Sequence, residues 1–303
     1  MAGPTSTFVI SLTPFTAAGA LDEAGLRGHL GRLRESGIGV YLGGSGSGEG
    51  YTLAPDELRR VLEIGVEELA GHVPVRAMGV EPRTAGQMIE LGALAADTGV
   101  DALQLYSLDQ GHGNRPRPAE LEHYLLDVLD AVALPVVVST HQAAGYFLPV
   151  DLVARLVDRY DTIAGINVTN PDVTYLVRMI DAVGDRVAVH VGGPMQALSC
   201  LALGGTGYLS SEGNVAPRLC VSVVEAYGRG DLTVAHSSYA RLMRLFAETR
   251  RLGGLSATKA MLELLGLPGG SPRPPRLPVD DATRAEISRV LDALDIRAVE
   301  GLA

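Results

Sequence analysis

Residues 134–167 read LPVVVSTHQAAGYFLPVDLVARLVDRYDTIAGIN, and this stretch contains the pattern that decides the fold. An apolar run at Leu134–Val138 precedes an amphipathic segment at Val150–Tyr160, and a second apolar run follows at Ile163–Asn167. Both runs are apolar on either face, as parallel strands covered by helices must be. The stretch therefore predicts a strand–helix–strand unit with two parallel strands.

The same alternation extends in both directions along the chain. The other expected strands are Phe8–Leu12, Gly39–Leu42, Val73–Met78, Ala102–Leu105, Val187–Val191 and Gly207–Leu209. The other expected helices are Asp22–Arg34, Pro55–Ala70, Ala85–Asp97, Ala119–Val132, Val173–Val183, Met195–Leu203 and Arg218–Tyr227. Eight strand–helix alternations predict an α/β fold of the (β/α)8 TIM barrel type, with a doubly wound open sheet as the alternative.

The expected strands stop before residue 231. Helical patterns follow at Leu232–Arg251, Ala257–Leu264 and Asp281–Leu294, with a connector rich in Pro and Gly at Pro268–Pro278. We therefore expect a barrel over residues 1–230 and a C-terminal helical extension over residues 231–303.

Composition limits the classes of partner. Hydrophobic residues make up 47% of the 303 residues, which is enough for a packed core. Acidic residues outnumber basic ones by 35 to 25, which argues against nucleic acid or an anionic membrane as a partner. Neither a membrane span nor a secretory signal is apparent, and Cys200 and Cys220 lie in apolar surroundings typical of free thiols. We expect a cytoplasmic protein.

Several short segments within or beside the expected strands, and one at the start of a C-terminal helix, follow one another in a recognisable order. They are Ile10-Ser11-Leu12-Thr13-Pro14-Phe15, Gly43-Gly44-Ser45-Gly46-Ser47-Gly48-Glu49, Leu134-Pro135, Ile163-Ala164-Gly165-Ile166, Gly204-Gly205-Thr206-Gly207 and Ala257-Thr258-Lys259-Ala260. Together they resemble the dihydrodipicolinate synthase/N-acetylneuraminate lyase family of barrel aldolases, and the resemblance covers nearly the whole chain. In such a barrel the loops after the strands carry the function.

The resemblance implies binding of a 2-oxo acid such as pyruvate as a Schiff base on a lysine at the end of strand six. The matching residues here are Gly165-Ile166-Asn167, and an amide nitrogen is not nucleophilic. The only lysine, Lys259, matches a C-terminal helix, where we expect a structural or surface residue. A relocated imine needs that helix to deliver the amine into the barrel mouth. The chain therefore resembles a divergent member without the Schiff-base lysine.

The family's proton-relay tyrosine, in a Tyr-Asn-x-Pro pattern after strand five, is matched here by Ser139 in Ser139-Thr140-His141-Gln142. The carboxylate-holding arginine of some members has no counterpart in residues 142–145. We expect His141, beside Ser139 and Asn167, to move the proton, because an imidazole titrates near neutral pH. Asn167 can donate an amide N–H to a developing enolate oxygen.

The glycine-rich loop is the expected binding segment. Ser47 and the backbone N–H groups of Gly46 and Gly48 can hold a small anion, although a simple tight turn is the alternative. Thr13 and Tyr106 complete the expected substrate site. On other loops, Arg83, Arg115 and Arg117 can hold a carboxylate or phosphate, or can simply be solvated.

No cofactor or metal is expected. His112, His141 and His190 with Glu49 or Glu81 can in principle bind zinc, but the chain has no His-x-His pair. Its Glu-x-x-His pair, Glu120 to His123, falls on an expected outer helix.

We therefore expect a lyase that acts on a small oxo- or carboxylate-bearing substrate without a lysine imine, by aldol-type C–C cleavage or condensation, dehydration or isomerisation. A catalytically silent homologue that binds a metabolite or partner subunit is the alternative. Apart from the small-molecule substrate, the resemblance implies self-association as a homotetramer or homodimer.

Overall fold

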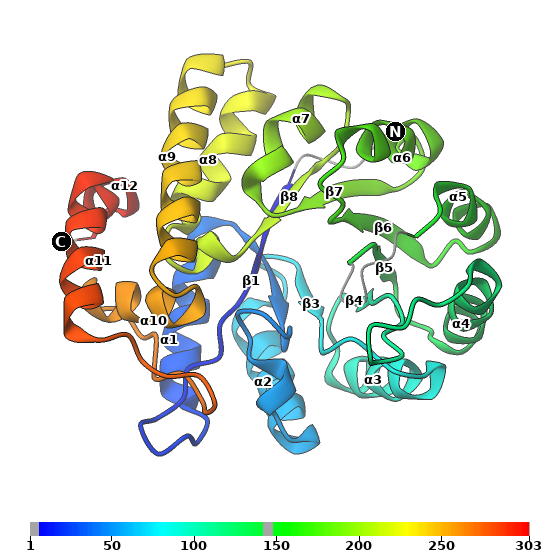
Figure 1. Cartoon of the computed structure of the whole chain (residues 1–303), viewed down its shortest axis with the longest axis horizontal. Helices are drawn as coiled ribbons and strands as arrows, with labels where there is room; N and C mark the ends of the chain where they lie inside the picture. Colours follow the sequence, from blue (N-terminus) through cyan, green and yellow to red (C-terminus); the bar gives the residue numbers. More distant parts are fainter. Residues whose placement is uncertain (1–5, 142–147, 303) are drawn as a thin grey trace. The chain divides into compact units, whose positions relative to one another are not determined.

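The computed structural model describes residues 6–141 and 148–302. Eight strands pair in chain order as a closed parallel barrel, and each overlaps an expected strand (Figure 1). They are β1 Ser6–Ile10, β2 Gly39–Leu42, β3 Val75–Ala77, β4 Ala102–Leu105, β5 Val136–Ser139, β6 Ile163–Val168, β7 Ala188–Gly192 and β8 Gly207–Ser210. Every residue of β5 is buried, as its apolar run predicts. The barrel prediction is confirmed.

A helix follows each strand, and further helices complete the chain. The first eight are α1 Glu23–Ser36, α2 Pro55–Leu69, α3 Ala85–Thr98, α4 Pro118–Ala131, α5 Val150–Arg159, α6 Val173–Val183, α7 Ala197–Ala202 and α8 Pro217–Gly228. The C-terminal helices are α9 Leu232–Arg251, α10 Leu255–Leu264, α11 Asp281–Ala293 and α12 Ile296–Glu300. Three short 3-10 turns are η1 Gly50–Thr52, η2 Pro194–Gln196 and η3 Ser211–Asn214.

Helix starts follow ordinary capping chemistry. The Asp22 side chain accepts a hydrogen bond from the Gly25 N–H at the start of α1. The Asp280 side chain does the same for the Thr283 N–H at the start of α11. Such caps satisfy amide groups that have no partner inside the helix. None of the helices in residues 6–141 and 148–302 is long and apolar enough to cross a membrane.

The chain forms two compact units. The first spans residues 76–209 and contains β4 to β7; the second combines residues 6–75 with residues from 210 onward. In the second unit α9 packs along α8, and α1 packs beside α2 (Figure 1). The second unit is therefore assembled from two segments that are far apart in the sequence. The division into a barrel at 1–230 and an extension at 231–303 stays a prediction.

Candidate active site

Three polar residues of the first unit lie side by side on neighbouring strands of the sheet. Ser139 on β5 pairs in register with Asn167 on β6, and Asn167 pairs with His190 on β7. Register partners on parallel strands direct their side chains to the same face. The Asn167 Nδ2 donates to Gln104 Oε1 on β4 at 3.2 Å, and β5 separates these strands. That bond therefore passes over β5 on the concave, inner face of the sheet.

The Asn167 amide keeps unused hydrogen-bonding capacity. Asn167 is 3% exposed, and its Oδ1 has no partner in the part of the chain that the structure describes. A primary amide has two N–H donors and a carbonyl acceptor, so Gln104 uses only one of these groups. An unpaired buried carbonyl costs about 1–3 kcal/mol. The Asn167 amide is therefore suited to bind a small polar ligand.

His190 is neutral at physiological pH. Burial lowers the pKa of its imidazole to about 3, and the nearby Arg76 charge acts in the same direction. Its Nδ1 lies 3.4 Å from Thr206 Oγ1. A group with this pKa can share a hydrogen bond, but near pH 7 it is not an imidazolium and therefore is a poor general acid.

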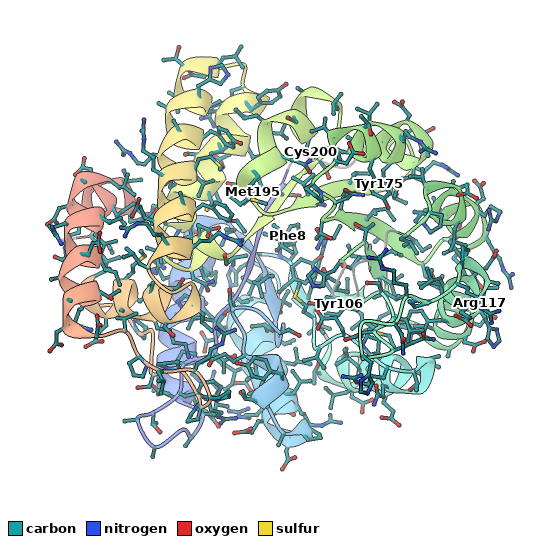
Figure 2. All side chains as sticks on the ribbon, viewed as in Figure 1. Phe8, Tyr106, Arg117, Tyr175, Met195 and Cys200 are labelled. Atoms are coloured by element: carbon teal, nitrogen blue, oxygen red, sulfur yellow. The ribbon has the colours of Figure 1, made fainter. Side chains whose placement is uncertain are left out.

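His141 forms a pair with an acid. Its Nε2 lies 3.2 Å from Glu81 Oε1, and the Glu81 side chain is only 17% exposed. The Tyr106 ring, labelled in Figure 2, meets the imidazole edge to face with centroids 6.2 Å apart. The His141 backbone N–H donates to Ser139 Oγ at 3.1 Å, and the Ser107 hydroxyl donates to the His141 carbonyl. An imidazole oriented by a carboxylate is the usual arrangement of a general base.

These contacts differ in part from the expected arrangement. Ser139 and Asn167 are register neighbours, but Ser139 meets His141 through the backbone. No hydrogen bond joins the His141 ring to Asn167 within residues 6–141 and 148–302. Glu81 entered the sequence argument only as a metal ligand, and its place on the loop after β3 was the available signal. Residues 142–147, where the arginine comparison falls, lie outside the described residues.

The glycine-rich loop belongs to the second unit. A Cβ on Gly50 would lie 2.0 Å from the Gly43 carbonyl oxygen, so the loop closes only with glycine there. The Thr13 hydroxyl donates to the Gly48 carbonyl at 2.8 Å and fixes the loop. Ser47 is 7% exposed and lines a cavity, together with Gly46.

Lys259 is buried behind this loop. Its ammonium donates to Glu49 Oε2 at 2.5 Å, to the Thr13 carbonyl at 2.9 Å and to the Ser271 carbonyl at 2.8 Å. The Arg273 N–H donates to the other Glu49 oxygen at 2.9 Å. Burial lowers the pKa of Lys259, and the Glu49 carboxylate opposes that shift. Of the two expected settings for Lys259, structural and surface, the buried structural one is found.

The candidate anion-binding arginines are exposed. Arg117, labelled in Figure 2, pairs with Glu120 at the start of α4. Arg83 covers Gly111, where a Cβ would come within 2.0 Å of Arg83 Nη1, and Arg115 is exposed on the same loop. Among the described residues no group of three or more His, Cys, Asp or Glu is placed to hold a metal ion.

Comparisons with known proteins agree on one family. The model of the dihydrodipicolinate synthetase family matches residues 4–294. The 4-hydroxy-tetrahydrodipicolinate synthase of Methanopyrus kandleri is 31% identical over 291 residues, which cover 94% of each chain. That of Methanothrix thermoacetophila is 33% identical over 94% of this chain and 95% of its own. A solved prophage protein from E. coli K12, described as a member of the dihydrodipicolinic acid synthase family in complex with pyruvate, superposes with a TM-score of 0.88. It is 28% identical over 96% of this chain and 99% of its own.

Proposed function

The chain belongs to the dihydrodipicolinate synthetase family of lyases, and we propose that it acts on a small oxo- or carboxylate-bearing substrate without a lysine imine. The proposed reaction is an aldol-type C–C cleavage or condensation, a dehydration or an isomerisation. The pyruvate complex of the E. coli relative supports a 2-oxo acid as the class of ligand.

The position of the only amine side chain carries this proposal. An ammonium group has three N–H donors, and the three partners of Lys259 use all of them. An imine needs a neutral amine whose lone pair faces the carbonyl carbon, so Lys259 is poorly suited to form one. The end of β6 holds Asn167 instead, which binds an oxygen through hydrogen bonds without becoming covalently attached.

We assign the proton transfer to His141. Glu81 accepts from the Nε2–H, which leaves the Nδ1 lone pair to take a proton from the carbon next to the substrate carbonyl. Asn167 then donates its second amide N–H to the enolate oxygen that develops. Removing one such donor typically costs about 2.7–4 kcal/mol of transition-state stabilisation. Ser139 acts as a positioning residue, because its hydroxyl accepts from the His141 N–H.

The proposed binding groups lie on the loops. Ser47 with the N–H groups of Gly46 and Gly48 holds the substrate carboxylate. Thr13 supports that loop through the Gly48 carbonyl, and Tyr106 packs against the His141 ring. These roles are consistent with a barrel in which the loops after the strands bind the substrate.

Trapping with borohydride tests the absence of an imine. The protein is incubated with pyruvate, 2-oxobutyrate or hydroxypyruvate, reduced with sodium borohydride and weighed intact by mass spectrometry. Reduction converts an imine into a stable secondary amine, so an imine-forming enzyme gains mass. We expect the mass to stay unchanged while each bound oxo acid raises the melting temperature. A reduced adduct on Lys259 would overturn the proposal.

Exchange of the pyruvate methyl protons in D2O, followed by NMR, tests the acid/base pair without knowledge of the full substrate. We expect His141→Gln to slow exchange about 10²–10⁴-fold, as loss of a general base does. Glu81→Gln should slow it less, because the imidazole remains. His123→Gln is the matched control on α4, with an 81% exposed side chain. Binding of all three oxo acids with no exchange would favour the catalytically silent homologue.

A further inference from the structure

Gln104 fixes the orientation of the Asn167 amide. The Asn167 Nδ2 donates to Gln104 Oε1 at 3.2 Å, and the two residues are 3% and 2% exposed, respectively. Gln104 lies on β4 and Asn167 on β6, so the bond joins two strands that are not neighbours. A primary amide that rotates by half a turn exchanges its N–H groups with its oxygen. The bond to the Gln104 oxygen keeps the Asn167 nitrogen on the side of β4.

The Asn167 oxygen is therefore directed away from Gln104. It is buried and accepts no hydrogen bond from the residues that the structure describes. Beside it β7 ends in Gly192, where a Cβ would lie 3.4 Å from the Asn167 Oδ1. Because Gly192 has no side chain, β7 cannot supply a side-chain donor from this position. The oxygen thus requires a donor from a bound molecule.

A second unpaired oxygen follows directly after β6. The Thr169 Oγ1 is buried, and it too has no partner within residues 6–141 and 148–302. The Thr169 Cβ would lie 3.3 Å from a Cβ on Gly192, so the side chains of Asn167 and Thr169 both approach this glycine. A ligand hydroxyl can donate to an amide oxygen and accept from a threonine hydroxyl. The two unpaired oxygens therefore favour a hydroxyl group over an apolar group beside Gly192.

We propose that the substrate is a 2-oxo acid with a hydroxyl group on the carbon next to its carbonyl, and that Gln104 imposes this preference. The inference rests on the proposed function, in which the second Asn167 N–H donates to the carbonyl oxygen. The hydroxyl group on the neighbouring carbon donates to Asn167 Oδ1, so one amide binds two adjacent oxygens. Such a substrate supplies the donor that a buried acceptor otherwise lacks. Pyruvate has a methyl group at that carbon and leaves the oxygen unpaired.

Gln104 is a positioning residue, because it acts on the substrate through Asn167. Without the Gln104 oxygen, the Asn167 amide is free to rotate by half a turn. It then presents either an N–H or its oxygen to each part of the substrate. A substrate with a hydroxyl group and one without it would bind alike, since specificity is a difference between two affinities. The ratio of those affinities therefore reports the orientation of the amide.

Titration calorimetry of the full chain compares hydroxypyruvate with 2-oxobutyrate, in which a methyl group replaces the same hydroxyl group. We expect hydroxypyruvate to bind about tenfold more tightly or better, as pairing of a buried polar group does. In Gln104→Met the ratio of the two Kd values should fall to about one. Gln104→Glu keeps an acceptor oxygen and should retain the preference. Gln87→Met is the matched control, because Gln87 is an exposed glutamine on α3.

Different results would overturn this inference and the proposed function. Equal affinities for hydroxypyruvate and 2-oxobutyrate in the unchanged protein would overturn the inference alone, if pyruvate proton exchange is still catalysed. An unchanged ratio in Gln104→Met would overturn the role of Gln104. Loss of the preference in Gln104→Glu as well would show that Gln104 donates to Asn167, against the orientation assigned here. Binding of neither these two oxo acids nor pyruvate would overturn the proposed function, and the inference with it.

Discussion

Replacing Lys259 with Met removes one partner of a buried ion pair while keeping a side chain of similar length. The two side chains are 2% and 0% exposed, so Glu49 would be left charged and away from water. Removal of one member of a buried pair costs about 3–5 kcal/mol. The Thr13 and Ser271 carbonyls also lose their donor, which places the expected loss at the upper end of that range.

This loss is a large share of the stability of an ordinary domain, about 5–15 kcal/mol. Urea unfolding followed by circular dichroism measures it as a lower midpoint with an unchanged slope. Arg284→Met is the matched control, because it breaks an exposed pair with Glu263 and should cost about 0.2–1 kcal/mol. Glu49→Gln combined with Lys259→Met should recover part of the loss, since no unpaired charge remains.

The reasoning fails if Lys259→Met is no more destabilising than Arg284→Met. Lys259 would then not be a buried structural residue. The amine would again be a candidate for imine formation, and the borohydride experiment would decide that point directly.

Three further predictions concern the whole molecule. Burial lowers the pKa of His29 and His190 to about 3, so below pH 6.5 the unfolded chain binds more protons than the native one, and stability falls with falling pH by about 1.4 kcal/mol per unit for each histidine. The urea midpoint of His29→Gln should therefore change less between pH 4 and 6 than that of the unchanged protein. The same change of midpoint with pH in both proteins would contradict a neutral buried His29. Burial raises the pKa of Cys200 to about 11 and Cys220 is also buried, so a thiol reagent should label both only after unfolding; fast labelling of the native protein would refute this. Light scattering should give the mass of a dimer or tetramer, and a monomeric mass would contradict the predicted self-association.

The barrel was predictable because its signal is local and repeated. Each strand is a short apolar run, and the periodicity changes between strand and helix on every repeat. The short helix α12 was not expected, because Ile296–Glu300 is too short for a periodic pattern to show. Strand ends differ by one or two residues, as at β1, which begins at Ser6 rather than Phe8.

The candidate site was predictable only in part. Asn167 and His141 could be placed at strand ends from the sequence, because the apolar run that predicts a strand also shows which residues end it. The partners could not, because Glu81 reaches His141 from another loop, and 210 residues separate Glu49 from Lys259. One signal was present: Lys259 is the single charged residue within Ala257–Leu262, and a charge there has to be paired if that helix is buried.

The contacts of Glu49 also determine how late in protein synthesis its surroundings are completed. Glu49 has a left-handed backbone with φ of 50°, which a non-glycine residue adopts only when its surroundings hold it there. The Arg273 backbone N–H donates a hydrogen bond to Glu49, and Arg273 is synthesised 224 residues after Glu49. At about 5–20 residues per second, roughly 10–45 s pass before the hydrogen bond from Arg273 to Glu49 can form. Throughout that interval the glycine-rich segment of the nascent chain lacks this contact, and a chaperone or a protease would meet it in that state.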